Sequence, residues 1–226
     1  MRPAGDCGSI GAQQAIMEEV VRDPLLETIG PAHDKAVDGA VGLPSLPTLI
    51  RDATSDDAPA IAHIGRDAFA ATHRTLIPAE LLDAVIEQTY SPEALVDCIT
   101  ACAAAPDAHF LVAESDGDVR GYLHFDCFGA RPELHRVYVA RELTGRGLGA
   151  RLLHELERRL DADTTYVLLV IAGNDGALRF YTREGFRDEQ TIEAAAFYSR
   201  QMGVTFPVGS APVRGLLLHK TIRRTS

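Results

Sequence analysis

The sequence predicts an α/β fold in which a mixed, mostly antiparallel sheet is flanked by helices. Three stretches lead to this prediction. Residues 109–127 form two strand-like runs around a Ser-Asp-Gly-Asp turn, which is typical of a hairpin. Residues 133–160 pass from an apolar strand through a glycine-rich loop into an amphipathic helix, and residues 166–186 continue with a strand and another helix. Antiparallel strands followed by strand–helix–strand indicate a mixed sheet.

The first half of the predicted domain holds one strand followed by three helices. Residues that favour a helix start precede each helix: an acidic Thr-Ser-Asp-Asp turn, a proline, and a Ser-Pro-Glu sequence. The expected elements are a strand over 48–51, a helix from the turn at 52–57 through Phe69, a loop over 70–77, a helix from Pro78 to about Thr89, and a helix from Ser91 to about Ala105.

The second half is richer in strands. Short apolar runs bounded by glycine, proline or acidic turns predict them. The expected elements are hairpin strands over 109–114 and 119–127, a strand over 133–139, a helix to Leu160, a strand over 166–171, a helix after Asn174, a strand over 186–192, an irregular stretch over 197–212, and a last strand over 213–221.

Residues 1–47 are predicted to be an N-terminal extension of uncertain order, separate from a domain over residues 48–226. Glycines and prolines punctuate the extension, and Pro24 interrupts its one helical pattern, over residues 13–29. A loosely ordered extension, an extra helix packed on the domain, and translation from an upstream start all remain open.

Length and composition are typical of one globular domain, with 226 residues, 46 % hydrophobic and 24 % charged. No apolar run approaches the roughly 20 residues of a membrane span, and the N-terminus lacks a signal-peptide pattern. We therefore expect a cytoplasmic protein with no membrane partner. A formal net charge of −10 argues against nucleic acid as a partner and is compatible with a cationic amine substrate.

Cysteine usage predicts neither a disulfide scaffold nor a metal site. The four cysteines, at positions 7, 98, 102 and 127, contain no C-x-x-C pair. Cys98 and Cys102 stand four residues apart in a predicted helix, where two thiols facing the core explain the spacing. We therefore expect no bound metal.

The glycine-rich loop is the strongest functional signal. Gly145, Gly147 and Gly149 alternate where a helix begins, so the backbone can approach a ligand without a Cβ in the way. The first-turn N–H groups of that helix lack partners and carry the positive end of the helix dipole, which suits a phosphate. A P-loop would require Gly-Lys-Ser/Thr and a dinucleotide fold would require G-x-G-x-x-G, and the sequence has neither.

Two motifs resemble those of the GNAT acyltransferases. Thr144–Gly149 is similar to their pyrophosphate loop, Gln/Arg-x-x-Gly-x-Gly/Ala, although Thr144 departs from the usual first residue. Asn174–Phe186 reproduces the N-x-x-A-x-x-F-Y-x-x-x-G-F pattern of the family. The resemblance covers roughly residues 46–221. It implies a six- or seven-stranded sheet that is splayed between strands four and five.

The resemblance also implies acetyl-CoA as co-substrate. In the family, the pantetheine arm lies in the splay and pairs with strand four, and a backbone N–H there can stabilise the oxyanion. Each of these assignments has an alternative explanation. Val137 and Val139 can be buried strand residues, Arg146 can be solvated on the loop, and Asn174 can cap the end of the strand. The residues that correspond to the family's cofactor contacts are Val137, Tyr138, Val139, Gly145, Arg146, Gly147, Leu148, Gly149, Ala150, Asn174 and Tyr181.

Three residues are candidates for the chemistry. An aliphatic amine is mostly protonated at neutral pH, so transfer requires a base. By its resemblance to the family's catalytic glutamate, Glu133 is the candidate base, and His135 on the same strand face is the alternative. Tyr181 occupies the position of the family's general acid, which protonates the leaving thiolate. The alternative explanation of Glu133 and of His135 is a polar residue that faces solvent at the start of a strand. The alternative for Tyr181 is packing of the Phe-Tyr pair against the sheet.

These motifs predict an N-acetyltransferase that moves an acetyl group directly from acetyl-CoA to a primary amine of a small molecule, polyamine-like or another metabolite. No cysteine lies in the motifs, in agreement with direct transfer. A protein lysine or N-terminal acetyltransferase and a non-catalytic acyl-CoA-binding module are the alternatives, and a homodimer stays open. The acceptor site is expected between residues 70–78 and 197–212, with His73, Tyr198 and Phe206 as candidates.

Overall fold

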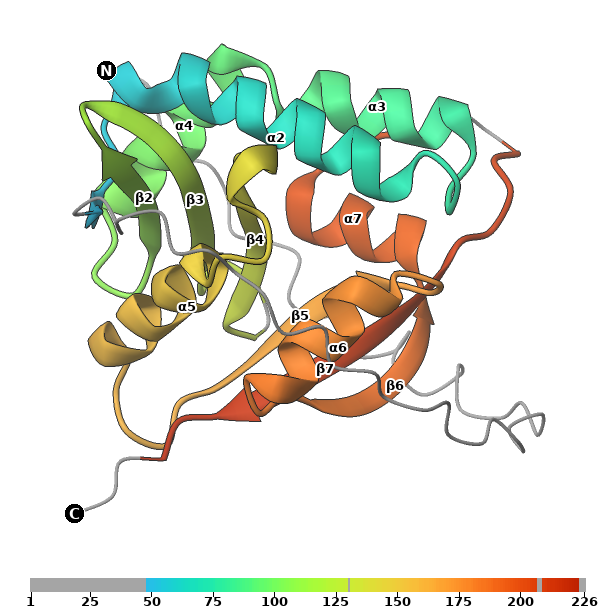
Figure 1. The fold of residues 1–226 in the computed structure, drawn as a ribbon. Coiled ribbons are helices and arrows are strands. Elements are labelled where there is room, and N and C mark those ends of the chain that lie inside the picture. Colours follow the sequence, from blue (N-terminus) through green and yellow to red (C-terminus); the bar gives the residue numbers. More distant parts are fainter. Residues whose placement is uncertain (1–47, 130, 207–208, 224–226) are drawn as a thin grey trace, which may run out of the picture. The chain divides into compact units, whose positions relative to one another are not determined.

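A mixed sheet of seven strands organises the part of the chain that this computed structural model describes, residues 48–129, 131–206 and 209–223 (Figure 1). The order is β1-β2-β3-β4-β5-β7-β6, and every neighbouring pair except β4–β5 is antiparallel. The predicted α/β fold is therefore confirmed. The strands are β1 Leu49–Asp52, β2 His109–Ser115, β3 Asp118–Asp126, β4 Glu133–Val139, β5 Thr165–Ile171, β6 Arg187–Glu193 and β7 Arg214–Thr221.

Helices cover both faces of the sheet (Figure 1). The sequence explains their starts: Ser91 Oγ, for example, accepts a hydrogen bond from the N–H of Ala94 at 3.1 Å, and Pro92 opens the helix after it. The helices are α2 Ala58–His73, α3 Ala79–Thr89, α4 Pro92–Ala103, α5 Leu148–Arg159, α6 Asp175–Arg183 and α7 Ala194–Met202, with 3₁₀ turns η1 Ser55–Asp57 and η2 Arg141–Leu143.

The alternation of side chains along β2 and β3 creates two apolar cores. Phe110, Val112 and Tyr122 face one way and pack with buried residues of α2, α3 and α4. Leu111 and Leu123 face the other way and pack against α5, which contributes Leu148, Leu152, Leu153 and Leu156. The strands β2–β4 are thus held between two helical layers.

The pairing of β3 with β4 is out of step at one point. Phe125 lies opposite Leu134, whereas His124 lies opposite Arg136, so His135 is an extra residue on β4. Such a β-bulge bends its strand and redirects side chains.

The sheet opens between β4 and β5. Within the described residues their parallel pairing consists of one register pair, Glu133 opposite Val167, although β4 continues for six more residues and β5 for four. By contrast, β5 and β7 pair along seven positions, from Thr165 to Ile171. The splay expected between strands four and five is therefore present.

Two predicted boundaries were wrong. The loop expected over 70–77 begins later, because α2 continues through His73; Ala70 and Ala71 are good helix formers and no breaker precedes Pro78. The stretch over 197–212 was expected to be irregular, yet α7 occupies its beginning. Glu193 caps α7 by accepting from two backbone N–H groups, and Gly203, at φ 66°, ends it in the left-handed region.

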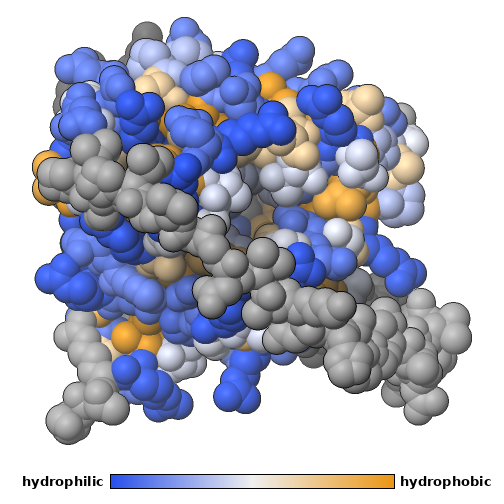
Figure 2. All heavy atoms as spheres, in the orientation of Figure 1, coloured by the Kyte–Doolittle hydropathy of each residue, from blue (hydrophilic) through white to orange (hydrophobic). Residues whose placement is uncertain are grey.

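The surface drawn in Figure 2 is mostly hydrophilic. Among the described residues, Leu49 and Phe128 are the large apolar side chains that are exposed. No helix in these ranges has the length and apolar character that crossing a membrane requires. Cys98 is half-buried and Cys102 buried in the core, in agreement with the expectation, while Cys127 is exposed. Residues 1–47, with Cys7 and the predicted extension, lie outside the described residues.

Candidate active site

The glycine loop places an uncapped helix start beside the splay. Gly145 and Gly147 have φ of 78° and 81°, a left-handed conformation that favours glycine, and a Cβ at either position would meet no other atom within 4 Å. Gly147 is the N-cap residue of α5, and no side chain caps this helix. Its first N–H groups are therefore available to an anion such as a pyrophosphate.

The open edge of β4 runs from the end of the Glu133–Val167 pairing toward this loop. Val137, Tyr138 and Val139 pair with β3 on one side and are half-buried. Both valines pack against the α5 core, whereas the Tyr138 ring packs on the opposite face of the sheet. Burial in the core, the simple explanation of the valines, is thus correct. The backbone edge of both valines that faces β5 is nevertheless unpaired within the described chain.

The two candidate bases, Glu133 and His135, lie together at the beginning of this edge. Glu133 Oε1 is 3.2 Å from His135 Nδ1, and their side chains are 4 % and 3 % exposed. They share one face of β4, as predicted. A polar residue facing solvent, the alternative explanation for each, does not fit this burial.

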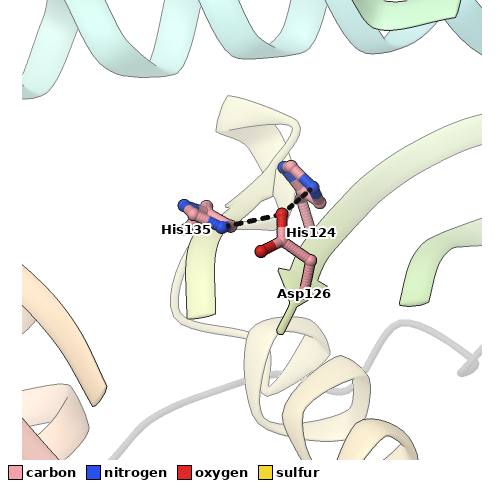
Figure 3. A group of neighbouring side chains, drawn as sticks. All are labelled: His124, Asp126 and His135. Atoms are coloured by element: carbon pink, nitrogen blue, oxygen red, sulfur yellow. Dashed lines mark ion pairs between the residues drawn. The ribbon is translucent and has the colours of Figure 1, made fainter. Parts of the chain in front are cut away.

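Sequence reasoning missed two neighbours of this pair, His124 and Asp126 on β3. Asp126 Oδ2 lies 3.0 Å from His135 Nε2 and 3.2 Å from His124 Nε2 (Figure 3). The signal was present in the sequence: His-x-Asp on one hairpin strand faces Glu-x-His on the next. The bulge at His135, which sequence periodicity does not reveal, brings them into contact.

The charges of this cluster follow from burial and from these contacts. Burial lowers the pKa of His124 to about 3 despite the nearby Asp126 carboxylate. Burial also disfavours the charged form of His135, but the carboxylates of Asp126 and Glu133 together raise its pKa to about 9. Burial alone would raise the pKa of Asp126, yet the two imidazoles hold it below its ordinary value. Without another ligand, His135 is the cationic member of the cluster.

The candidate acid, Tyr181, lies on α6, across the splay from β4. Its ring makes edge-on contacts with Phe180 and Phe186, at centroid distances of 4.9 and 5.3 Å. Burial raises the pKa of its phenol above the ordinary value, and the proximity of Tyr181 contributes to the raised pKa values of Tyr138 and Tyr198. The phenol is therefore protonated at neutral pH and available as a hydrogen-bond donor.

Asn174 caps α6, as the structural explanation of this residue predicted. Its Oδ1 accepts a hydrogen bond from the N–H of Ala177 at 3.1 Å. The amino group of the same side chain can still donate to a ligand. Arg146 is exposed on the loop, a position compatible both with solvation and with contact to a bound anion.

Of the two segments expected to form the acceptor site, the one over 197–212 contacts α3, the helix that follows residues 70–78 in the chain. Gln88 on α3 exchanges two hydrogen bonds with the backbone of Thr205 after α7, at 2.8 and 2.9 Å. Tyr198 and Phe206 pack against the same core. His73, however, is only 5 % exposed and its Nδ1 lies 3.0 Å from the carbonyl of Phe69, so it is a core residue and not a contact for an acceptor.

An open strand edge beside an uncapped helix start suited to phosphate, with the candidate base and the candidate acid on the elements around it, is the architecture expected of an acyltransferase site. Sequence comparison supports this class. The profile of the acetyltransferase (GNAT) family matches residues 76–186. The chain belongs to the GNAT family, and it is an N-acetyltransferase.

Two relatives illustrate the range of acceptors in similar proteins. The chain is 26 % identical over 144 residues to the spermidine N(1)-acetyltransferase of Thermoplasma acidophilum, a match that spans 63 % of this chain and 89 % of the relative. It is 36 % identical over 88 residues to the N-alpha-acetyltransferase RimI of Mycobacterium tuberculosis, which spans 37 % of this chain and 55 % of that relative.

Solved structures share the fold. The PaiA N-acetyltransferase of Thermoplasma acidophilum, determined in complex with coenzyme A, superposes with a TM-score of 0.61 at 22 % identity over 78 % of this chain and 99 % of that one. A GNAT-superfamily phosphinothricin acetyltransferase from Sinorhizobium meliloti, in complex with acetyl-CoA, gives a TM-score of 0.57 at 18 % identity over 78 % and 89 % of the two chains.

Proposed function

We propose that this protein transfers the acetyl group of acetyl-CoA directly to a primary amine of a small molecule of the polyamine class. The observation that carries the proposal is the splay: β4 and β5 share only the Glu133–Val167 pair in the described chain, and the open β4 edge leads to the uncapped start of α5. An extended pantetheine arm fits such an edge, and a pyrophosphate fits such a helix start.

The binding residues follow from this placement. Backbone groups of Val137 and Val139 hold the pantetheine arm, and an N–H on this strand faces the thioester oxygen, where it stabilises the oxyanion. The N–H groups between Gly145 and Ala150 hold the pyrophosphate, and Arg146 adds a charge contact. The amino group of Asn174 donates to a pantetheine carbonyl.

Glu133 and Tyr181 share the proton transfers. Glu133 accepts a proton from the amine through a bound water, which frees the nitrogen lone pair to attack the thioester carbon. As the carbon–sulfur bond breaks, Tyr181 donates its hydroxyl hydrogen bond to the sulfur and then the proton. Both ring nitrogens of His135 face carboxylates, so neither is directed at an amine; this favours Glu133 over His135 as the base.

A small amine is favoured over a protein acceptor by the extent of the relatives' matches. The match to the spermidine enzyme spans 144 residues, 63 % of this chain and 89 % of that relative, so it extends well beyond the stretch from Glu133 to Phe186 that holds the cofactor motifs. The 88-residue match to RimI covers much less of this chain. The net charge of −10 also suits a polycation. A cytoplasmic location, where acetyl-CoA is supplied, belongs to the same proposal.

The test is release of free CoA thiol from acetyl-CoA by the full chain, with spermidine, spermine, amino acids, aminoglycosides and N-terminal or lysine peptides as acceptors. We expect release that depends on a polyamine. Release that depends only on peptides would establish the protein acetyltransferase instead. Tight acetyl-CoA binding by calorimetry without turnover on any acceptor would favour a non-catalytic acyl-CoA-binding module.

A further inference from the structure

His124, Asp126 and His135 form a buried group of three potential metal ligands. His124 and Asp126 are two residues apart on β3, so both side chains point to the same face. His135 reaches them from β4, where the bulge places it beside this pair (Figure 3). All three side chains therefore come from strands of the sheet: two from β3 and one from the neighbouring β4.

The distances suit a tetrahedral ion. One donor atom from each residue lies within 4.8 Å of the other two. Asp126 Oδ2 is 3.2 Å from His124 Nε2 and 3.0 Å from His135 Nε2. Zinc bonds of about 2.0–2.1 Å in tetrahedral geometry place neighbouring ligand atoms about 3.3 Å apart.

In the described structure the ring nitrogens of His124 and His135 have ion-pair contacts with Asp126 and Glu133 but no hydrogen bonds. The side chains of His124 and His135 are 6 % and 3 % exposed, yet none of their four nitrogens makes a hydrogen bond. Their contacts with Asp126 have ion-pair distances but not hydrogen-bond angles. Buried polar atoms are rarely left unbonded, because each costs about 1–3 kcal/mol.

A metal-free ion pair explains only part of the cluster. A protonated His135 between Asp126 and Glu133 would be balanced, but His124 would keep two buried nitrogens without a hydrogen bond. A shared cation satisfies one nitrogen on each ring. The contacts around the group also match those of a metal site. Asp126 Oδ1 accepts a hydrogen bond from the N–H of Phe128 at 3.1 Å, which leaves Oδ2 for a metal. Glu133 faces Nδ1 of His135, the position that a carboxylate often occupies beside a metal-bound histidine.

We propose that His124, Asp126 and His135 bind one Zn²⁺ ion at the bulge between β3 and β4. Two imidazoles and one carboxylate are a donor set that suits zinc, and three protein ligands leave a fourth position for water or another small ligand. The ion joins β3 to β4 next to Glu133. The proposal stands apart from the choice of acceptor and departs from the expectation of no metal, which considered the cysteines alone.

The test is zinc binding by the full chain, measured by competition with a chromophoric chelator after removal of bound metal. We expect one Zn²⁺ per chain with a submicromolar Kd. His124→Asn and Asp126→Asn should each raise Kd at least about 10-fold. The matched controls are His63→Asn and Asp67→Asn, an exposed His–Asp pair on α2 that should leave Kd unchanged.

Wild-type protein provides a second measurement that no folding defect can confuse. X-ray absorption at the zinc edge should show N/O ligation that includes two imidazoles, and Co²⁺ in its place should give the intense visible bands of a tetrahedral site. Absence of stoichiometric zinc binding would overturn the proposal. So would binding that the control pair weakens as much as His124→Asn and Asp126→Asn do, or an absorption spectrum without imidazole ligands.

Discussion

Glu133 lies opposite Val167 at the single point where, among the described residues, β4 and β5 are joined as neighbours in the sheet. The backbone of Val167 also donates a hydrogen bond to the carbonyl of Pro132 at 3.0 Å, immediately before β4 begins. Beyond this point the strands separate. The candidate base is therefore located at the closed end of the splay, and the open edge of β4 extends from it toward the α5 loop.

Replacement of Gly147 should weaken acetyl-CoA binding. Gly147→Ala puts a Cβ at the start of α5, where the ligand's phosphates would approach the backbone, and we expect Kd for acetyl-CoA to rise roughly 10-fold. Gly117→Ala in the β2–β3 turn is a matched control: its φ is 82° against 81° for Gly147, and a Cβ meets no atom within 4 Å at either site. Both variants should lose about 1 kcal/mol of stability. Calorimetry that shows equal Kd values for the two would contradict the loop assignment.

Removal of the Tyr181 hydroxyl should slow turnover without loss of cofactor affinity. For Tyr181→Phe we expect kcat to fall roughly 100-fold, as for loss of a general acid, with Kd for acetyl-CoA within about twofold of wild type. Tyr166→Phe is the control, because both rings make edge-on contacts with Phe186, at 5.2 and 5.3 Å, while the Tyr166 hydroxyl bonds Glu157 instead. Unchanged kcat in Tyr181→Phe would remove it as the acid.

Replacement of Glu133 by glutamine should remove the base and keep the shape of the side chain. We expect kcat for an amine acceptor to fall roughly 100-fold while acetyl-CoA still binds. Glu142→Gln, at a solvent-exposed carboxylate on η2, should behave as wild type. Full turnover by Glu133→Gln would move the proton transfer to another group, and steady-state rates with spermidine would show it.

Stability should fall in weak acid because of His73. Burial lowers its pKa to about 4, whereas in the unfolded chain it returns to the ordinary 6.5. Between these values the unfolded chain binds more protons, so the free energy of unfolding falls as the pH drops from 6.5 to 4, by at most about 3 kcal/mol, and the contribution is fully present above pH 6.5.

Urea unfolding at pH 7 and pH 5 measures this contribution. His124 titrates in the same direction, so the informative quantity is the difference between wild type and His73→Gln. The variant should lose about 2 kcal/mol less between the two pH values, whereas His63→Gln, at an exposed histidine, should lose as much as wild type. Equal losses in all three proteins would show that His73 is not buried as a neutral side chain.

Local signals were sufficient to predict most of the elements and to find the motif residues. The start of α4 at Pro92, the hairpin from β2 to β3 and the glycine loop before α5 all depend on residues that are neighbours in the chain. The two errors were also local in origin: the alanines after Phe69 prolong α2, and the Glu193 cap begins a helix that runs into the stretch predicted to be irregular.

What the sequence by itself determined was the secondary elements other than α7 and the backbone freedom of the glycine loop, because helix periodicity, caps and glycine conformation act over a few residues. Tertiary structure alone decided the rest. The register shift at His135 and the single Glu133–Val167 pair depend on how separate strands align, a property that neither strand encodes alone. For that reason Tyr181 was identified from a motif, whereas the contact of His124 and Asp126 with His135 emerged only from the folded sheet.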